Sequence, residues 1–142
     1  AGEWTFVVPR GPSRVLLVAW RSHALDAGYA SQQEYHERVF ADIALAAPRR
    51  VRAGVQFAFR GQLVGGYIPP EHSIIQMEIF FLERWRTIET LRTNSRGRFA
   101  YRYSFSPEVA DRASYLFRAV IQYSRTYPFL AATSWPVRVR VG

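Results

Sequence analysis

Short segments in which apolar and polar residues alternate make up most of the chain after residue 48. Such alternation is typical of β-strands with one buried face. The segments that show it are 55–59, 75–81, 85–90, 99–105, 115–121 and 135–141. Glycine and proline clusters between them, such as those at 65–66 and 69–70, mark turns. With a first strand near 41–47, the pattern predicts about seven strands in an immunoglobulin-like β-sandwich.

The first residues of the chain alternate in the same way. Trp4, Phe6 and Val8 fall on one side of a predicted strand that ends at Pro9. The next predicted strand, 14–20, is apolar on both sides, and a strand of that kind is expected to be buried on both faces. Its apolar residues are Val15, Leu16, Leu17, Val18, Ala19 and Trp20. Three strands alone cannot provide that burial, so we expect cover from elsewhere.

The N-terminal strands also resemble later ones in order and spacing. "GEWTFVVP" at 2–9 is similar to "GRFAYRYS" at 97–104, and "SRVLLVAW" at 13–20 to "SYLFRAVI" at 114–121. "YHERVFADIAL" at 35–45 has the pattern of "SWPVRVRVG" at 134–142. Any two β-hairpins share alternation and glycine turns, which is the alternative explanation. We favour an internal repeat.

The repeat predicts how the chain is divided. Residues 1–47 are expected to be the last three strands of a partial sandwich unit, so that the chain begins in the middle of a domain. Residues 48–142 are expected to form a complete immunoglobulin-like β-sandwich.

Three longer stretches carry a family resemblance. They are "RVRAGVQFAFRGQLVGGYIPP", "ERWRTIETLRTNSRGRFAYRYSF" and "YPFLAATSWPVRVRV". They resemble the tandem immunoglobulin-like repeats of large secreted or surface proteins of actinobacteria. The resemblance implies an extracellular or cell-surface protein with a structural role and no assigned activity. Glu83 departs from the pattern, because the family usually has glycine in this hairpin, so the turn type stays open.

Charge is spread unevenly along the chain. All nineteen basic residues are arginine. Residues 1–47 carry a net charge of −1 and residues 48–142 carry +9, which again suggests two units. The longest apolar run, Val15 to Trp20, is far too short to cross a bilayer, so no membrane insertion is expected.

Candidate catalytic residues are few and scattered. His23, His36 and His72 lack the spacing that would place two of them on one metal ion. Glu78 and Glu83 are five positions apart, which puts them on opposite faces of a strand and excludes paired acid–base work. No phosphate-binding, dinucleotide-binding or calcium-binding motif occurs. The sequence therefore predicts a protein that is not an enzyme, with no cofactor and no metal.

Arginines form the alternative candidate site. Arg98 and Arg102 share one predicted strand face, and Arg138 and Arg140 share another. Such a face could bind an anionic cell-wall polymer or glycan with strong salt dependence. The other interpretation is an ordinary soluble face, and no aromatic residues are interleaved there for nucleic-acid stacking. A nucleic-acid partner is not expected.

The main functional hypothesis rests on the uncovered N-terminal strands. The expected partner interface consists of Trp4, Phe6, Val8, Val15, Leu16, Leu17, Val18 and Trp20. We expect another chain, a copy of this one or a second chain of the same assembly, to cover these residues. The sequence thus predicts a non-catalytic extracellular building block of a surface protein or filament, assembled by strand complementation between subunits. An accessory module that binds an anionic polymer or glycan through the arginines is the alternative.

Overall fold

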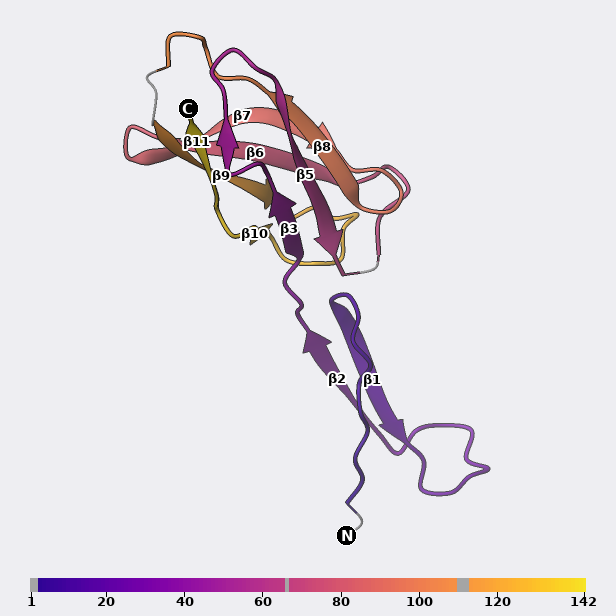
Figure 1. Ribbon diagram of the computed structural model, residues 1–142. Helices are drawn as coiled ribbons and strands as arrows, with labels where there is room; N and C mark the ends of the chain where they lie inside the picture. Colours follow the sequence, from indigo (N-terminus) through magenta and orange to yellow (C-terminus); the bar gives the residue numbers. More distant parts are fainter. Residues whose placement is uncertain (1–2, 66, 110–112) are drawn as a thin grey trace.

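The computed structural model describes residues 3–65, 67–109 and 113–142, and these residues form an all-β protein (Figure 1). Among them, no helix has the length and apolar character that a membrane span requires. The strands are β1 (Arg14–Trp20), β2 (Ser31–Glu37), β3 (Asp42–Ala46), β4 (Arg50–Val51), β5 (Phe57–Val64), β6 (Ile74–Phe81), β7 (Arg84–Arg92), β8 (Arg98–Tyr103), β9 (Ser114–Ile121), β10 (Ala132–Thr133) and β11 (Val137–Val141).

Two sheets pack face to face and form a sandwich. One has the strand order β3-β5-β8, and the other has the order β4-β11-β9-β6-β7, with β10 beside β9. The β4–β11 pair is parallel, whereas the other pairs between named strands are antiparallel. The predicted all-β immunoglobulin-like sandwich is confirmed.

Aromatic side chains fill the space between the two sheets. Phe59 of β5 and Phe117 of β9 are both fully buried, and their ring centroids are 4.7 Å apart. In the same layer, Phe105 stacks on Tyr115, and their ring centroids are 4.9 Å apart. These rings belong to the alternating sets of the sequence, because alternate strand positions face the same side of a sheet. The alternation at 99–105 therefore marks core residues.

A close approach between strands depends on one glycine. Gly61 of β5 pairs with Phe99 of β8. A Cβ atom on Gly61 would lie 2.1 Å from the Phe99 ring, so the ring occupies the space that a side chain would need. Phe99 is buried there, and the aromatic side chain covers the backbone of the glycine.

The structure defines the type of the turn between β6 and β7, which the sequence left undetermined because Glu83 stands where glycine was expected. Leu82 and Glu83 both have positive φ angles, of 51° and 61°. They join Phe81 and Arg84, which are paired in the ladder. Two residues with positive φ in a two-residue loop form a type I′ turn. This hairpin therefore has a type I′ turn although neither of its two loop residues is glycine.

The β1–β2 hairpin projects away from the sandwich (Figure 1). Hydrogen bonds hold its base. The Ser13 amide donates to the carbonyl oxygen of Pro128 at 2.8 Å, and the Val39 amide donates to the Ser13 hydroxyl at 2.8 Å. Leu130 bonds to the chain on both sides of Phe40, with its amide donating to Val39 and its carbonyl accepting from Ala41. Among the described residues, these hydrogen bonds fix the hairpin to the sandwich at its base.

The division of the chain differs from the predicted boundary between residues 47 and 48. Strand β3 pairs with β5, and Ala41 and Ile43 are buried in the sandwich core. The segment 35–45, predicted as one strand, is divided between β2 and β3. Residues 3–9 are not part of a strand. The hairpin unit thus holds two strands, because the apolar side chains of β3 are buried by the sandwich.

Candidate functional site

One face of the β1–β2 hairpin gathers large apolar side chains. The register pairs Leu16 with Tyr35, Val18 with Gln33 and Trp20 with Ser31, so all six share this face. The N-terminal segment lines the same hollow of about 1210 Å³. We call the following set the apolar hairpin face: Trp4, Phe6, Val8, Leu16, Val18, Trp20 and Tyr35.

The apolar hairpin face is open to solvent. Trp4, Phe6 and Trp20 are 66%, 68% and 63% exposed. Tyr35 is half exposed, and Leu16 and Val18 are partly buried. In the part of the chain that the structure describes, the sandwich core contains none of these residues. The expected partner interface is therefore available.

The opposite face of the hairpin is less apolar. Val15 and Leu17 of β1 are more than half exposed there. Their partners in β2 are His36 and Glu34, which are polar. Of the eight residues predicted for the interface, those at positions 15 and 17 thus point to a mixed face. The sequence did not single out Tyr35, because the polar strand β2 shows no apolar alternation.

Polar contacts fix the geometry of the hairpin. The Arg14 Nε atom donates to the Glu37 carboxylate at 2.6 Å across the first pair of the ladder. The Arg14 guanidinium also bonds to the carbonyl oxygen of Pro9, which holds the N-terminal segment beside β1. In the loop that joins the two strands, the His23 amide donates to the Asp26 carboxylate at 2.8 Å.

The four arginines predicted as anion-binding residues, in two pairs, are divided between two sheets. Arg98 and Arg102 lie on β8, in the β3-β5-β8 sheet, whereas Arg138 and Arg140 lie on β11 in the other sheet. A single sheet face made of all four does not exist. The sequence could not show this, because strand neighbours in a sandwich are set by its topology.

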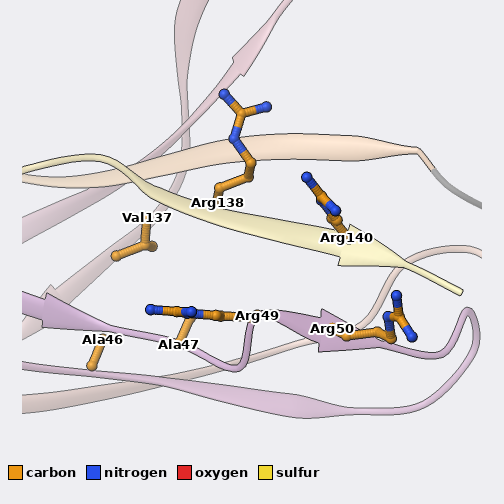
Figure 2. Close-up of a pocket in the computed structure, with 7 residues that line it drawn as sticks. All are labelled: Ala46, Ala47, Arg49, Arg50, Val137, Arg138 and Arg140. Atoms are coloured by element: carbon orange, nitrogen blue, oxygen red, sulfur yellow. The ribbon is translucent and has the colours of Figure 1, made fainter.

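A different arginine cluster surrounds a hollow beside β11. Figure 2 shows Arg138 and Arg140 of β11 above Arg50, the first residue of β4, and Arg49, which precedes it. The hollow has a volume of about 570 Å³, and its remaining lining residues are Ala46, Ala47 and Val137. We call this set of seven residues the arginine cleft.

A third hollow lies where β6 begins and β7 ends. It has a volume of about 340 Å³, and its lining includes Glu71, His72, Arg92 and Tyr127. Hydrogen bonds from the backbone and from Thr126 lower the pKa of the Glu71 carboxyl, and the nearby Arg92 guanidinium adds to this. Burial raises the pKa of the Tyr127 hydroxyl to about 12.

The candidate catalytic residues lie on separate elements of the structure. His23 follows β1 in the hairpin loop, His36 lies on β2 and His72 precedes β6. Glu78 binds the Arg118 Nε atom at 2.6 Å, and the Arg118 guanidinium lies 4.1 Å from the centre of the Trp85 ring. This arrangement holds Glu78 in an ion pair on the outer sheet face. Among the described residues, no three His, Cys, Asp or Glu side chains gather as metal ligands would.

The sandwich is similar to solved structures of other all-β proteins. A superoxide reductase (neelaredoxin) from Ignicoccus hospitalis aligns with a TM-score of 0.52 at 13% identity, over 71% of this chain and 80% of that one. A CARDB domain from Pyrococcus furiosus in complex with di-metal ions aligns with a TM-score of 0.48 at 14% identity, over 75% and 94% of the two chains. A PKD domain of an M14-like peptidase from a Thermoplasmatales archaeon aligns with a TM-score of 0.44 at 12% identity, over 70% and 92%.

Neither a family model nor a curated protein matches the chain. At these identities, the likeness to the superoxide reductase shows the fold alone, and the two alignments with lower scores carry no argument. The coarse resemblance, to immunoglobulin-like all-β domains, is supported by the sandwich of two sheets itself. A tandem array and an actinobacterial origin stay predictions.

The function predicted from the sequence is contradicted by this comparison. The non-catalytic building block was inferred from the uncovered N-terminal strands and from a resemblance to structural repeats, and its alternative, the polymer-binding accessory module, was inferred from the arginines. The same architecture occurs in a superoxide reductase, which is an enzyme, so the fold does not indicate a structural role. Any function has to be argued from the surfaces of this chain.

Proposed function

We propose that this protein is a self-associating binding module in which the apolar hairpin faces of two copies pack against each other. The exposure of Trp4, Phe6 and Trp20 on one face of a projecting hairpin carries the proposal. Burying a large apolar side chain contributes about 1.5–3 kcal/mol, and large exposed apolar patches mark interaction sites.

Charge favours a second copy as the occupant of this face. Residues 3–40 contain four arginines and four acidic residues, so the hairpin unit is neutral. Residues 41–142 contain fifteen arginines and seven acidic residues, which gives a charge of +8. Two sandwiches repel each other, so two copies can approach closely only through their hairpins.

The proposed contact is a two-fold pair of sheet faces. In such a contact the same surface is used on both copies, so the assembly closes as a dimer. The hairpin is fixed at its base and projects from the sandwich (Figure 1), which keeps the two positive sandwiches apart. The module acts through binding rather than catalysis, and an extracellular location is part of the same proposal.

Sedimentation of the full chain over a range of concentrations tests the proposal. We expect the wild-type chain to form a dimer at about 100 μM, an affinity reached by small interfaces. Leu16→Asp places a charge on the apolar hairpin face and should yield a monomer at the same concentration. Leu17→Asp adds the same charge to the opposite face of β1 and is the matched control, which should remain dimeric.

Three outcomes would contradict self-association through this face. The first is a wild-type chain that stays monomeric at 100 μM and at higher concentrations. The second is a dimer that Leu16→Asp leaves intact. The third is a dimer that both substitutions abolish equally, because this would show a general effect of charge on the hairpin. Far-UV circular dichroism of each variant establishes that the sandwich is folded.

A further inference from the structure

The arginine cleft concentrates positive charge in a hollow of the sandwich. The parallel pairing of β11 with β4 sets Arg140 directly beside Arg50. Arg49 lies next to the same pair, because its carbonyl oxygen accepts a hydrogen bond from the Arg140 amide at 3.0 Å. Like charges placed directly opposite each other across a sheet destabilise the pair. The fold therefore bears a local electrostatic cost at this site.

Within the described ranges, the ion pairs of the chain do not include any arginine of the cleft. The polar contact recorded for these guanidinium groups is from Arg138 Nη1 to the Ser114 hydroxyl, at a long 3.4 Å. The acidic residues that do form ion pairs with arginine, Glu37 and Glu78, lie on β2 and β6. The donors of the cleft are thus available to a ligand.

The shape of the cleft fits a small ligand. Its other lining residues, Ala46, Ala47 and Val137, have short side chains, which leave space between β3 and β11. In Figure 2 the Arg49 side chain reaches along this space above Ala47. A volume of about 570 Å³ lies in the range of small-molecule sites. The arginines on β8 belong to the other sheet and do not extend the cleft.

We infer that the arginine cleft binds a small polyvalent phosphate-bearing anion. Guanidinium groups donate two parallel hydrogen bonds to oxyanions and remain charged at any physiological pH. A planar carboxylate accepts such pairs in one plane, whereas a tetrahedral phosphate accepts them from several directions. Two of the arginines come from β11 and two from the segment 49–50 at β4, on opposite sides of the hollow, and this arrangement favours phosphate. Several linked phosphates are needed to neutralise four guanidinium groups.

Titration calorimetry of the full chain with inorganic tripolyphosphate, in about 50 mM salt, tests the inference. We expect saturable binding with one site per chain. The double substitution Arg50→Gln/Arg140→Gln should weaken it about tenfold or more, because it removes the adjacent pair. Arg98→Gln/Arg102→Gln removes the same charge from the other sheet and is the matched control, with a change of no more than about twofold.

Two further arms make the result decisive. Arg49→Gln/Arg138→Gln should weaken binding as the first pair does, which excludes a folding defect particular to one variant. Citrate carries several carboxylates and should bind at least about tenfold more weakly than tripolyphosphate. The inference is overturned if the wild type does not bind, if the control pair weakens binding as much as the cleft pairs, or if citrate binds as tightly as tripolyphosphate.

Discussion

The sandwich and the β1–β2 hairpin contain similar apolar side chains in opposite surroundings. In the sandwich, Phe59, Phe117 and Ile75 are completely buried between two sheets. In the hairpin, Trp20 is 63% exposed, since the described residues place no second sheet on its apolar face. Apolar alternation in a strand thus shows which face is to be covered, but not whether the same chain covers it.

From this comparison, we expect the largest change in the free energy of unfolding when an aromatic side chain of the core is removed. Phe59→Ala should lower the free energy of unfolding by about 3–5 kcal/mol, since it removes buried atoms and leaves a cavity between the sheets. Leu16→Ala on the hairpin should change it by less than about 0.5 kcal/mol in dilute solution, where the chain is monomeric.

Urea unfolding at low and high protein concentration measures both effects. If the proposed dimer forms, Leu16→Ala should become destabilising at high concentration, because it would weaken an association that stabilises only the folded state. If Leu16→Ala costs as much as Phe59→Ala in dilute solution, the hairpin is part of the core and the contrast between the two regions is wrong.

Two glycines give the second test. Gly61→Ala should destabilise the protein by about 1–3 kcal/mol, because the new Cβ would lie 2.1 Å from the Phe99 ring in a packed core. Gly28→Ala in the hairpin loop meets nothing within 4 Å and should have almost no effect. Thermal melts of both variants decide this, and equal melting temperatures would show that Phe99 moves aside without cost.

Alkaline pH gives the third test. Burial raises the pKa of Tyr127 from 10.0 to about 12, so the unfolded chain loses this proton more readily than the folded one. The corresponding stability is fully present below pH 10 and is lost as the pH rises towards 12. The difference between the two pKa values corresponds to a loss of about 2 kcal/mol by pH 11.5, and Tyr127→Phe should remove it.

Urea unfolding measures the decrease in the free energy of unfolding between pH 9 and pH 11.5. Burial also raises the pKa values of Tyr101 and Tyr103, so part of the alkaline loss should remain in Tyr127→Phe. Tyr35→Phe, which changes an exposed tyrosine of the hairpin, is the control and should retain the full loss. An unchanged loss in Tyr127→Phe would mean that the Tyr127 hydroxyl is hydrated in the folded state.

Strand positions in the sandwich were predictable because each strand has one buried face. The alternation at 75–81 corresponds to β6, and that at 115–121 corresponds to β9. Strand β2 was not predictable in this way. Its sequence, SQQEYHE, is polar on both faces, and it forms because β1 offers a ladder of hydrogen-bond partners.

The candidate sites were predictable to the same extent as the strands: only where the pattern that marks them is local in the sequence. The apolar hairpin face could be expected from Trp4, Phe6 and the residues of 14–20, since their pattern is local. The arginine cleft could not, because Arg50 and Arg140 are 90 positions apart in the sequence and meet through a parallel pair at the edge of a sheet. Residue spacing carries no information on which strands become neighbours.

The bonds at the hairpin base also determine the order of events during folding. A two-stranded hairpin is marginally stable in water, and the carbonyl groups of Pro128 and Leu130 that hold this one belong to a distant part of the chain. A sandwich of such non-local pairs forms in milliseconds to seconds, whereas a hairpin forms and melts in microseconds. The apolar hairpin face is therefore presented persistently only after the sandwich has closed, so that the proposed dimer would form from folded chains and not from folding ones.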